Sequence, residues 1–351
     1  MIKYLGSKRL LLPALSAAAL ELAEAQQPVL DLFSGTSRVG QAFKRCGFAV
    51  RSNDLNAYAA TIARCYVQAD AQTERSAAAE ILPILAAAQP VRGHFTTTWC
   101  EESRFFHPDN GARIEGMRNC LAELNLAEPL HSVVLTSLIE AADRVDSTTG
   151  VQMAYLKSWA PRALKPIELR LPELIDGKGK VTQLDAAEAA RDSGPVELAY
   201  LDPPYNQHSY VGNYHVWESL ALWDQPEVYG VACKRSDVRE RKSPFNSKRK
   251  IHAAMADVLD ALDARTILVS FNNEGFISED EMIDLLKPHG EVARTRFDYK
   301  RYVGAQIGVH DPKGKRVGKV SHLRNRELLF AVAPTHQQAD AAVRAAERAM
   351  A

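Results

Sequence analysis

The sequence predicts an α/β protein with a doubly wound parallel sheet and an inserted, mainly helical domain. Three observations favour this fold class. Residues 28–56 read as strand, glycine-containing turn, helix, strand and acidic turn. The strand–helix alternation then stops between about residues 72 and 180, and it resumes after residue 180. The chain of 351 residues is long enough for two domains, because one domain commonly takes about 100–200 residues.

The elements before residue 72 form the first half of the predicted sheet. The strand at 28–33 ends in Ser34-Gly35-Thr36-Ser37, a turn that leads into the next helix. Gly47 follows that helix, at a position where glycine commonly ends helices. In order, we expect a helix at 11–26, the strand at 28–33, a helix at 39–46, a strand at 48–52, the turn Asn53-Asp54-Leu55-Asn56 and another helix.

The insertion and the second half of the sheet divide the rest of the chain. We assign residues 1–71 and 180–334 to the sheet domain, 72–179 to the insertion and 335–351 to a C-terminal helical tail. Helices in the insertion are predicted at 76–88, 114–126 and 131–145. The second half should contain strands at 180–184, 197–201, 265–271, 292–302 and 327–332 and a helix at 279–287, with the last two strands forming a hairpin.

Composition places the chain among ordinary globular proteins. Hydrophobic residues make up 46% and charged residues 25%, which excludes a mostly disordered chain, a collagen and a coiled coil. The 43 Lys and Arg balance 43 Asp and Glu, and this neutrality argues at first against a nucleic-acid-binding protein. The balance is uneven, however. Residues 234–250 hold eight basic and two acidic side chains, and residues 294–326 hold ten and two.

Cysteine spacing and hydropathy exclude several classes of site. No two cysteines are spaced as Cys-x-x-Cys, so neither a disulfide scaffold nor a structural zinc site is indicated. Cys100, His107, Cys120 and His131 fit no metal-binding pattern, and we predict no metal. The N-terminus lacks the features of a signal peptide, and no apolar run reaches about 18–20 residues. We therefore expect a cytoplasmic protein with no membrane association. The five cysteines are Cys46, Cys65, Cys100, Cys120 and Cys233.

The most informative motif is Asp202-Pro203-Pro204-Tyr205, directly after the apolar strand Leu198-Ala-Tyr-Leu201. Ligands of open α/β sheets bind at the carboxyl ends of the strands, so the motif lies at the expected active edge. A rigid turn that closes a strand is the alternative. Two other predicted strands also end in candidate ligand-binding residues, Asp31 to Gly35 and Asp54.

Taken together, these residues resemble the adenine-specific DNA methyltransferases of the Dam type, which use S-adenosyl-L-methionine. Lys3-Tyr-Leu-Gly-Ser-Lys8 is similar to the family's N-terminal cofactor motif, and Ser270-Phe-Asn-Asn-Glu-Gly275 to its segment after a later strand. Asn213-Tyr-His-Val-Trp-Glu218 and the run from Asp143 to Leu169 look most like modification methylases that accompany restriction endonucleases. The resemblance implies a Rossmann-like methyltransferase fold with a target-recognition domain inserted before the Asp-Pro-Pro-Tyr strand.

The resemblance also implies the reaction, which is methyl transfer from S-adenosylmethionine to the N6 amine of a flipped adenine in double-stranded DNA. The Asp202 carboxylate and the Pro203 carbonyl would accept the two N–H groups of this poorly nucleophilic amine. The two prolines would stiffen the loop, and Tyr205 would stack on the base. The implied catalytic residues are Asp202, Pro203, Pro204 and Tyr205, with double-stranded DNA and a cognate restriction endonuclease as partners.

For the cofactor, the resemblance implies that Asp54 binds the ribose hydroxyls and that Gly35 lets the backbone approach the methionine moiety. A helix N-cap is the alternative for Asp54, and Asp185 could face the cofactor adenine or cap a helix. Ser37 replaces a glycine that is common in the family's loop, which is tolerable at negative φ and strained at positive φ. The implied cofactor-binding residues are Tyr4, Lys8, Asp31, Phe33, Gly35, Asp54, Asp185 and Asp202.

DNA contacts are expected from the two basic stretches and from the insertion. Basic loops beside a catalytic edge suit phosphate contacts, although such runs are often only solvated charge. In the insertion, Tyr155 and Trp159 could read the target or simply form the core of a helical domain. The expected DNA-binding residues are Lys157, Arg162, Lys234, Arg235, Lys248, Arg249, Lys313, Lys315 and Arg316, the last three at a predicted hairpin tip.

Other functions remain open at the level of sequence. An RNA N6-adenine methyltransferase shares the Asp-Pro-Pro-Tyr chemistry, but the long insertion argues against it. N4-cytosine methylation poses the same chemical problem, and Asp before Pro-Pro favours adenine. A catalytically silent DNA-binding regulator would keep the fold, yet Ser37 is the only departure from the motifs. A nicotinamide dehydrogenase would require Gly-x-Gly-x-x-Gly, which is missing.

Overall fold

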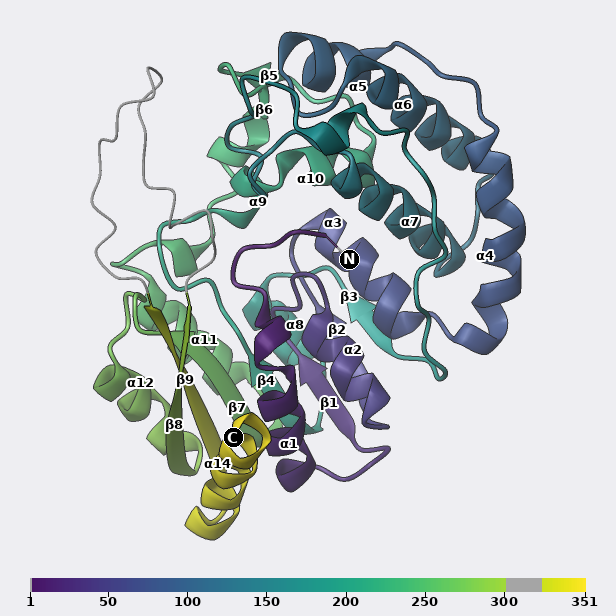
Figure 1. The fold of residues 1–351 in the computed structure, drawn as a ribbon. Helices are drawn as coiled ribbons and strands as arrows, with labels where there is room; N and C mark the ends of the chain where they lie inside the picture. The colour runs from purple at the N-terminus through teal and green to yellow at the C-terminus, as the bar shows by residue number, and fades with distance from the viewer. Residues whose placement is uncertain (1, 301–323) are drawn as a thin grey trace.

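The computed structural model describes residues 2–300 and 324–351 and contains a seven-stranded sheet with the strand order β3-β2-β1-β4-β7-β9-β8 (Figure 1). All neighbouring pairs from β3 to β7 are parallel, and β9 runs antiparallel to both of its neighbours. The predicted terminal hairpin is therefore confirmed. The strands are β1 (Pro28–Asp31), β2 (Ala49–Asn53), β3 (Lys180–Thr182), β4 (Val196–Leu201), β7 (Ala264–Asn272), β8 (Glu291–Lys300) and β9 (Arg324–Ala333).

Helices cover both faces of this sheet, as a doubly wound fold requires. Alternate residues of a strand point to opposite faces, so Leu198 and Tyr200 of β4 join one core while Ala199 and Leu201 join another. The first core is closed by α1 (Leu12–Leu22), α2 (Arg38–Arg45) and α14 (His336–Met350), and the second by α8 (Ala186–Asp192), α11 (Ile251–Ala261) and α12 (Glu279–Leu286). The predicted Rossmann-like α/β fold is confirmed.

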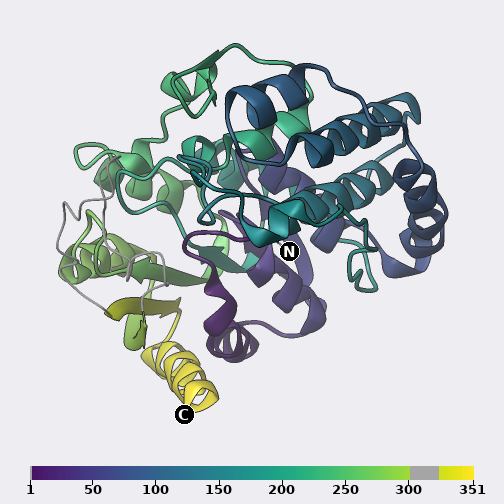
Figure 2. The same ribbon diagram turned by 45° about the horizontal axis from the view of Figure 1, so that its top comes forward.

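A helical layer lies on one side of the sheet and forms a third core. It contains α3 (Ala57–Ala63), α4 (Ala71–Ala86), α5 (His94–Thr96), α6 (Pro108–Glu123), α7 (Leu130–Arg144), α9 (Tyr210–Asn213) and α10 (His215–Leu222). The last two follow the sheet strand β4 in sequence, yet Trp217 of α10 packs 5.9 Å from Phe106, ring centroid to ring centroid. In both views this layer lies at the opposite end of the molecule from α14 (Figures 1 and 2).

Shorter elements complete the chain. A two-stranded antiparallel ribbon follows α10 and is formed by β5 (Val228–Tyr229) and β6 (Lys234–Arg235). Single 3-10 or π-helical turns occur at Lys8–Leu10, Arg64–Gln68, Thr97–Glu102, Pro161–Leu164, Ser236–Arg239, Pro244–Asn246 and Lys287–His289. Among residues 2–300 and 324–351, no helix has the length and apolar character that a membrane span requires.

Candidate active site

A large pocket opens at the carboxyl ends of β1, β2 and β4. Here the strand order changes direction, because β2 and β3 lie on one side of β1 and β4 and β7 lie on the other. This is the topological switch point at which doubly wound sheets bind their ligands. The pocket encloses about 1090 Å³ of empty space, open solvent at its mouth included. It is lined by all eight residues that the sequence predicted for the cofactor: Tyr4, Lys8, Asp31, Phe33, Gly35, Asp54, Asp185 and Asp202.

The turn after β2 orients the Asp54 carboxylate. Its Oδ1 accepts hydrogen bonds from the backbone N–H and the side-chain amide of Asn56, at 2.9 and 3.0 Å. Its Oδ2 accepts the N–H of Gly35 at 2.9 Å, so the acidic turn and the glycine loop are joined. Burial raises the pKa of Asp54, and these donors oppose the rise. Asp54 is not the cap of the following helix, because its contacts stay within the turn and the glycine loop.

The glycine loop after β1 approaches Tyr4 closely. A Cβ atom on Gly35 would lie 3.1 Å from the Tyr4 ring, and Gly35 has φ of +51°. Ser37 also adopts a left-handed conformation, with φ of 55° and ψ of 25°. The sequence left two outcomes for this serine, and the structure has the strained one. Ser37 is fully buried, and its hydroxyl has no partner among the described residues.

Asp31, at the end of β1, is a buried acid. Its Oδ2 accepts the N–H of Gly40 at 3.0 Å, while its buried Oδ1 has no hydrogen-bond partner in the described part of the chain. Burial raises the pKa of Asp31 to about 8, and the nearby Asp202 and Asp54 add to the rise. A cationic group of a ligand at Oδ1 would lower this pKa and give the carboxylate the partner that it lacks among the described residues.

Asp202 follows β4 and is paired with a buried lysine. The Lys8 Nζ lies 2.8 Å from Asp202 Oδ1 and 2.8 Å from Glu327 Oε1, and the Ser270 hydroxyl donates to the same Asp202 oxygen at 3.3 Å. Burial raises the pKa of Asp202 to about 6, with Lys8 opposing and Glu327 adding to the rise. Burial would lower the pKa of Lys8, but the two carboxylates outweigh it and raise that pKa.

The rest of the Asp-Pro-Pro-Tyr loop is held by backbone and ring contacts. Pro204 lines the pocket, and Pro203 is buried. The Tyr205 ring packs edge-on against Phe271. The backbone carbonyl of Tyr205 accepts a hydrogen bond from the N–H of Phe276 at 2.8 Å. Burial raises the pKa of Tyr205 to about 12, so its hydroxyl is protonated at neutral pH. The loop is thereby fixed against the segment that follows β7.

An aromatic stack that the sequence did not predict forms another wall of the pocket. The Tyr4 ring lies between Tyr210 and Tyr214, with centroid distances of 5.3 and 4.7 Å and interplanar angles of 22° and 17°. Tyr210 also lines the pocket. Asp185, exposed at the start of α8, accepts the N–H of Ala187 at 3.1 Å, so it both caps this helix and faces the pocket.

The residues predicted to bind DNA are scattered over several environments. Lys157, Lys248 and Arg249 are exposed, and Lys234 is half-buried. Arg162 is partly exposed, and its Nε donates to Asp146 Oδ1 at 2.8 Å. Lys313, Lys315 and Arg316 lie outside the described residues.

Arg235 needs a correction. Its side chain is only 3% exposed, with a guanidinium nitrogen 2.6 Å from Asp224 and another 3.0 Å from Asp237. These carboxylates occupy the guanidinium inside the protein, which argues against a phosphate contact.

The aromatic candidates of the insertion also have partners. Tyr155 packs edge-on against Phe105, 5.6 Å between ring centroids, and therefore joins the helical core. The guanidinium of Arg104 lies 4.4 Å from the centroid of the Trp159 ring. No group of three or more His, Cys, Asp or Glu side chains in the described ranges is arranged to hold a metal ion, and all five cysteines are free.

Comparisons with known proteins agree with the geometry. Residues 4–284 match the family model of D12 class N6 adenine-specific DNA methyltransferases. The chain is 29% identical to modification methylase StsI from Streptococcus sanguinis over 87% of its own length and 50% of the relative's. It is 30% identical to type II methyltransferase M.FokI from Planomicrobium okeanokoites, over 86% of its own length and 50% of the relative's. It is 31% identical to type II methyltransferase M.NlaIII from Neisseria lactamica, over 78% of its own length and 83% of the relative's. The chain thus spans about half the length of the first two relatives.

Proposed function

The chain belongs to the family of D12 class N6 adenine-specific DNA methyltransferases, and from this premise we propose that it methylates the N6 amine of a flipped adenine in double-stranded DNA. S-adenosylmethionine would be the methyl donor, and the context a restriction–modification system in the cytoplasm with a cognate endonuclease. The observation that carries the proposal is the position of Asp202, whose carboxylate lies at the pocket that the ends of β1 and β2 also line.

The residues of the pocket fit this cofactor. The Asp54 carboxylate would accept hydrogen bonds from the ribose hydroxyls of the cofactor. Acidic residues play this role at the end of the second strand in dinucleotide-binding folds. The buried Oδ1 of Asp31, which has no partner among residues 2–300 and 324–351, suits the ammonium of the methionine moiety. Gly35 leaves room that a Cβ would fill, and Phe33 and Asp185 also line the pocket. When bound, the cofactor supplies a methyl group on a sulfonium sulfur.

The reaction requires the protein to make the adenine amine nucleophilic. Its lone pair is delocalised into the ring, so acceptors for both N–H groups favour the tetrahedral form. Asp202 Oδ2 and the Pro203 carbonyl would serve as these acceptors, and Tyr205 would stack on the base. The Asp202 carboxylate would take up the proton that the amine loses when it accepts the methyl group. The rest of the catalysis is alignment of the two reactants.

On the DNA side, exposed and partly exposed cations support phosphate contacts. We propose this role for Lys157, Arg162, Lys234, Lys248 and Arg249, and Lys313, Lys315 and Arg316 stay predicted contacts. We propose residues 72–179 as the target-recognition domain, residues 1–71 and 180–334 as the methyltransferase domain, and residues 335–351 as a C-terminal helical tail. The names of the relatives, modification methylase and type II methyltransferase, support the restriction–modification context.

The test is methyl incorporation from tritiated S-adenosylmethionine into duplex DNA, with nucleoside analysis of the product. We expect N6-methyladenine with the wild type and none with Asp202→Asn. Labelling of ribosomal RNA alone would favour an RNA methyltransferase, and N4-methylcytosine would favour the cytosine variant. If the protein bound DNA but not S-adenosylmethionine, a silent regulator would replace the enzyme.

A further inference from the structure

The segment Asn213–Glu218 resembles modification methylases, but none of the proposed catalytic steps uses it. Its last residue, Glu218 of α10, is only 1% exposed. Glu218 Oε1 accepts the N–H of Ala57 and Oε2 accepts the N–H of Tyr58, each at 3.1 Å. These N–H groups begin helix α3, so a carboxylate from a distant helix caps α3.

This cap substitutes for a local one. Asn56 occupies the N-cap position of α3, yet its side chain makes no capping hydrogen bond to the helix and donates instead to Asp54. The start of α3 is therefore held by Glu218, while the side chain of Asn56 holds the turn that carries Asp54. Because the turn and the helix are consecutive, the position of Glu218 fixes where the Asp54 carboxylate stands in the pocket.

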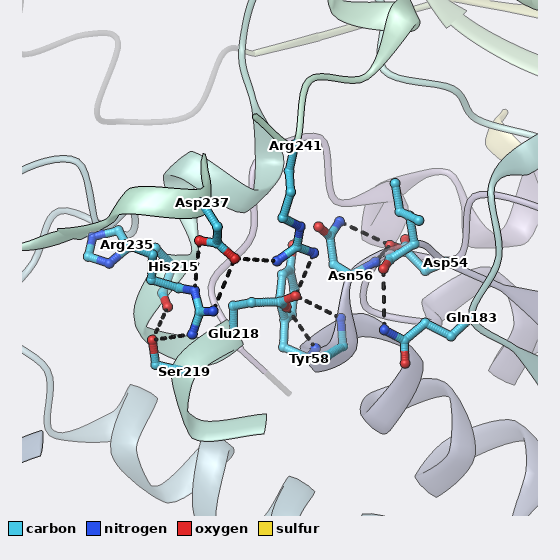
Figure 3. Close-up of polar contacts among 12 residues, drawn as sticks. Asp54, Asn56, Tyr58, Gln183, His215, Glu218, Ser219, Arg235, Asp237 and Arg241 are labelled. Carbon is cyan, nitrogen blue, oxygen red and sulfur yellow. Dashed lines mark hydrogen bonds and ion pairs between the residues drawn. The ribbon is translucent and has the colours of Figure 1, made fainter. Parts of the chain in front are cut away.

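Arg241 connects Glu218 to the segment that follows the β5–β6 ribbon. Its Nη2 lies 2.6 Å from Glu218 Oε1, and its Nη1 lies 3.5 Å from Asp237. Asp237 in turn pairs with buried Arg235, which donates to the Ser219 hydroxyl of α10 at 3.3 Å. Figure 3 shows this network as one continuous chain of contacts beside Asn56 and Asp54.

The residues after Arg241 form part of the pocket wall. Arg241, Ser243, Phe245 and Asn246 all line the pocket. Phe245 packs edge-on against Phe33, 5.2 Å between ring centroids. The wall segment, residues 241–246, is thus anchored at Glu218 by an ion pair and at Phe33 by an aromatic contact.

We propose that Glu218 and Arg241 are positioning residues for cofactor binding, which together hold the Asp54 turn and the wall segment in the arrangement that S-adenosylmethionine binds. The inference rests on the proposed function. Neither residue has to touch the reacting atoms. Their effect reaches the cofactor through the start of α3 on one side and through the wall segment on the other.

The test measures the Kd of S-adenosylmethionine by isothermal titration calorimetry for the whole protein and its variants. We expect Glu218→Gln and Arg241→Met each to raise this Kd by about tenfold, a typical size for coupling between sites. The double variant should bind about as weakly as the weaker single variant, because both substitutions break the same contact. The KM for S-adenosylmethionine should rise more than kcat falls. Arg241→Lys, which keeps the charge, should recover part of the affinity.

Arg239→Met is the matched control. Arg239 is an exposed cation two residues before Arg241, with its guanidinium 3.8 Å from the Tyr229 ring centroid and no contact with Glu218 in the structure. Its Kd for S-adenosylmethionine should equal that of the wild type. If Glu218→Gln fails to fold, Arg241→Met at a partly exposed site decides the question. Wild-type affinity in Arg241→Met would overturn the inference, whereas a wild-type protein that does not bind S-adenosylmethionine would overturn the proposed function.

Discussion

Asp202 and Glu218 are two carboxylates beside the same pocket, and their partners differ. Both oxygens of Glu218 accept backbone N–H groups, and a guanidinium approaches one of them. The contacts of Asp202 with Lys8 and Ser270 both fall on Oδ1. Both oxygens of Glu218 are therefore engaged in structure. Among the described residues the contacts of Asp202 fall on Oδ1, and we propose that Oδ2 accepts the incoming N–H group. The roles of the two carboxylates therefore follow from the donors that each one accepts.

The two cations suit these roles. A guanidinium offers a planar fork of donors and binds two carboxylates at fixed angles, which suits the link from Arg241 to Glu218 and Asp237. The Lys8 ammonium is a compact charge that lies between Asp202 and Glu327. It lowers the cost of burying the Asp202 carboxylate without occupying both of its oxygens. Substitutions at Asp202, Glu218 and Glu327 test this contrast.

Removing the proton acceptor should have the largest effect. Asp202→Asn should lower the rate of methyl transfer by about 10³-fold, because an amide cannot accept the amine proton. The Kd for S-adenosylmethionine should change by no more than a few-fold, since Asp54 and the glycine loop are intact. Single-turnover kinetics and calorimetry measure the two quantities. A weakened Kd with an unchanged rate would reverse the proposed roles.

Glu218→Ala should have the next largest effect, which is a loss of folding stability. It leaves two helix N–H groups and a guanidinium without their acceptor, which should lower the free energy of unfolding by about 2–4 kcal/mol. Asp202→Asn should change that free energy by less than about 1 kcal/mol, because Asp202 accepts no backbone N–H of the described residues and Lys8 keeps Glu327 as a partner. Urea denaturation compares the two variants. Equal losses would remove the distinction between a structural and a reactive carboxylate.

The pH dependence of activity should follow Asp202. Because its pKa is raised to about 6, the carboxyl is protonated and inactive below that pH and ionised above it. We expect kcat/KM to fall about tenfold per pH unit below pH 6. Glu327→Gln removes a negative charge that raises this pKa, so the acidic limb should move to lower pH by up to about one unit. Asp284→Asn, at an exposed carboxylate of α12, should leave the limb in place.

The smallest effect should come from a polar group that has no partner. Ser37 is buried at φ of 55°, and its hydroxyl is unpaired within the described ranges. Ser37→Gly relieves the left-handed strain and should raise the free energy of unfolding by up to about 1 kcal/mol, or Tm by about 2 °C. Ser37→Ala keeps the strain and should gain less. Calorimetry in both variants separates strain from the unpaired hydroxyl.

Charge counting along the sequence overestimated the cationic surface. Arg235 and Arg241 lie in the basic stretch 234–250, but Asp224, Asp237 and Glu218 hold them internally. In the second stretch, Arg294 and Arg296 both pair with Glu279. A count of residues cannot register these pairs, because the acids come from other elements. In the first stretch, Lys234, Lys248 and Arg249 are the residues for which we propose phosphate contacts.

Local sequence patterns predict the sheet and the edge at which the pocket forms. Alternating apolar residues and turn signals predict parallel strands, and the carboxyl ends of parallel strands converge at one edge. For this reason, Asp31, Asp54 and Asp202 could be assigned to one site before their contacts were known. The eight predicted cofactor residues all line a single pocket.

The side chains that contact those residues become visible only in the folded protein. Lys8 contacts Glu327, although the two residues lie near opposite ends of the sequence. Glu218 caps a helix that lies far before it in sequence. Such pairs depend on how separate elements pack, and local spacing contains no signal for them. The same holds for the conformation of Ser37 and for the burial of Arg235. Local patterns are set by neighbouring residues along the chain, whereas the electrostatic environment of a site is set by residues that only folding brings together.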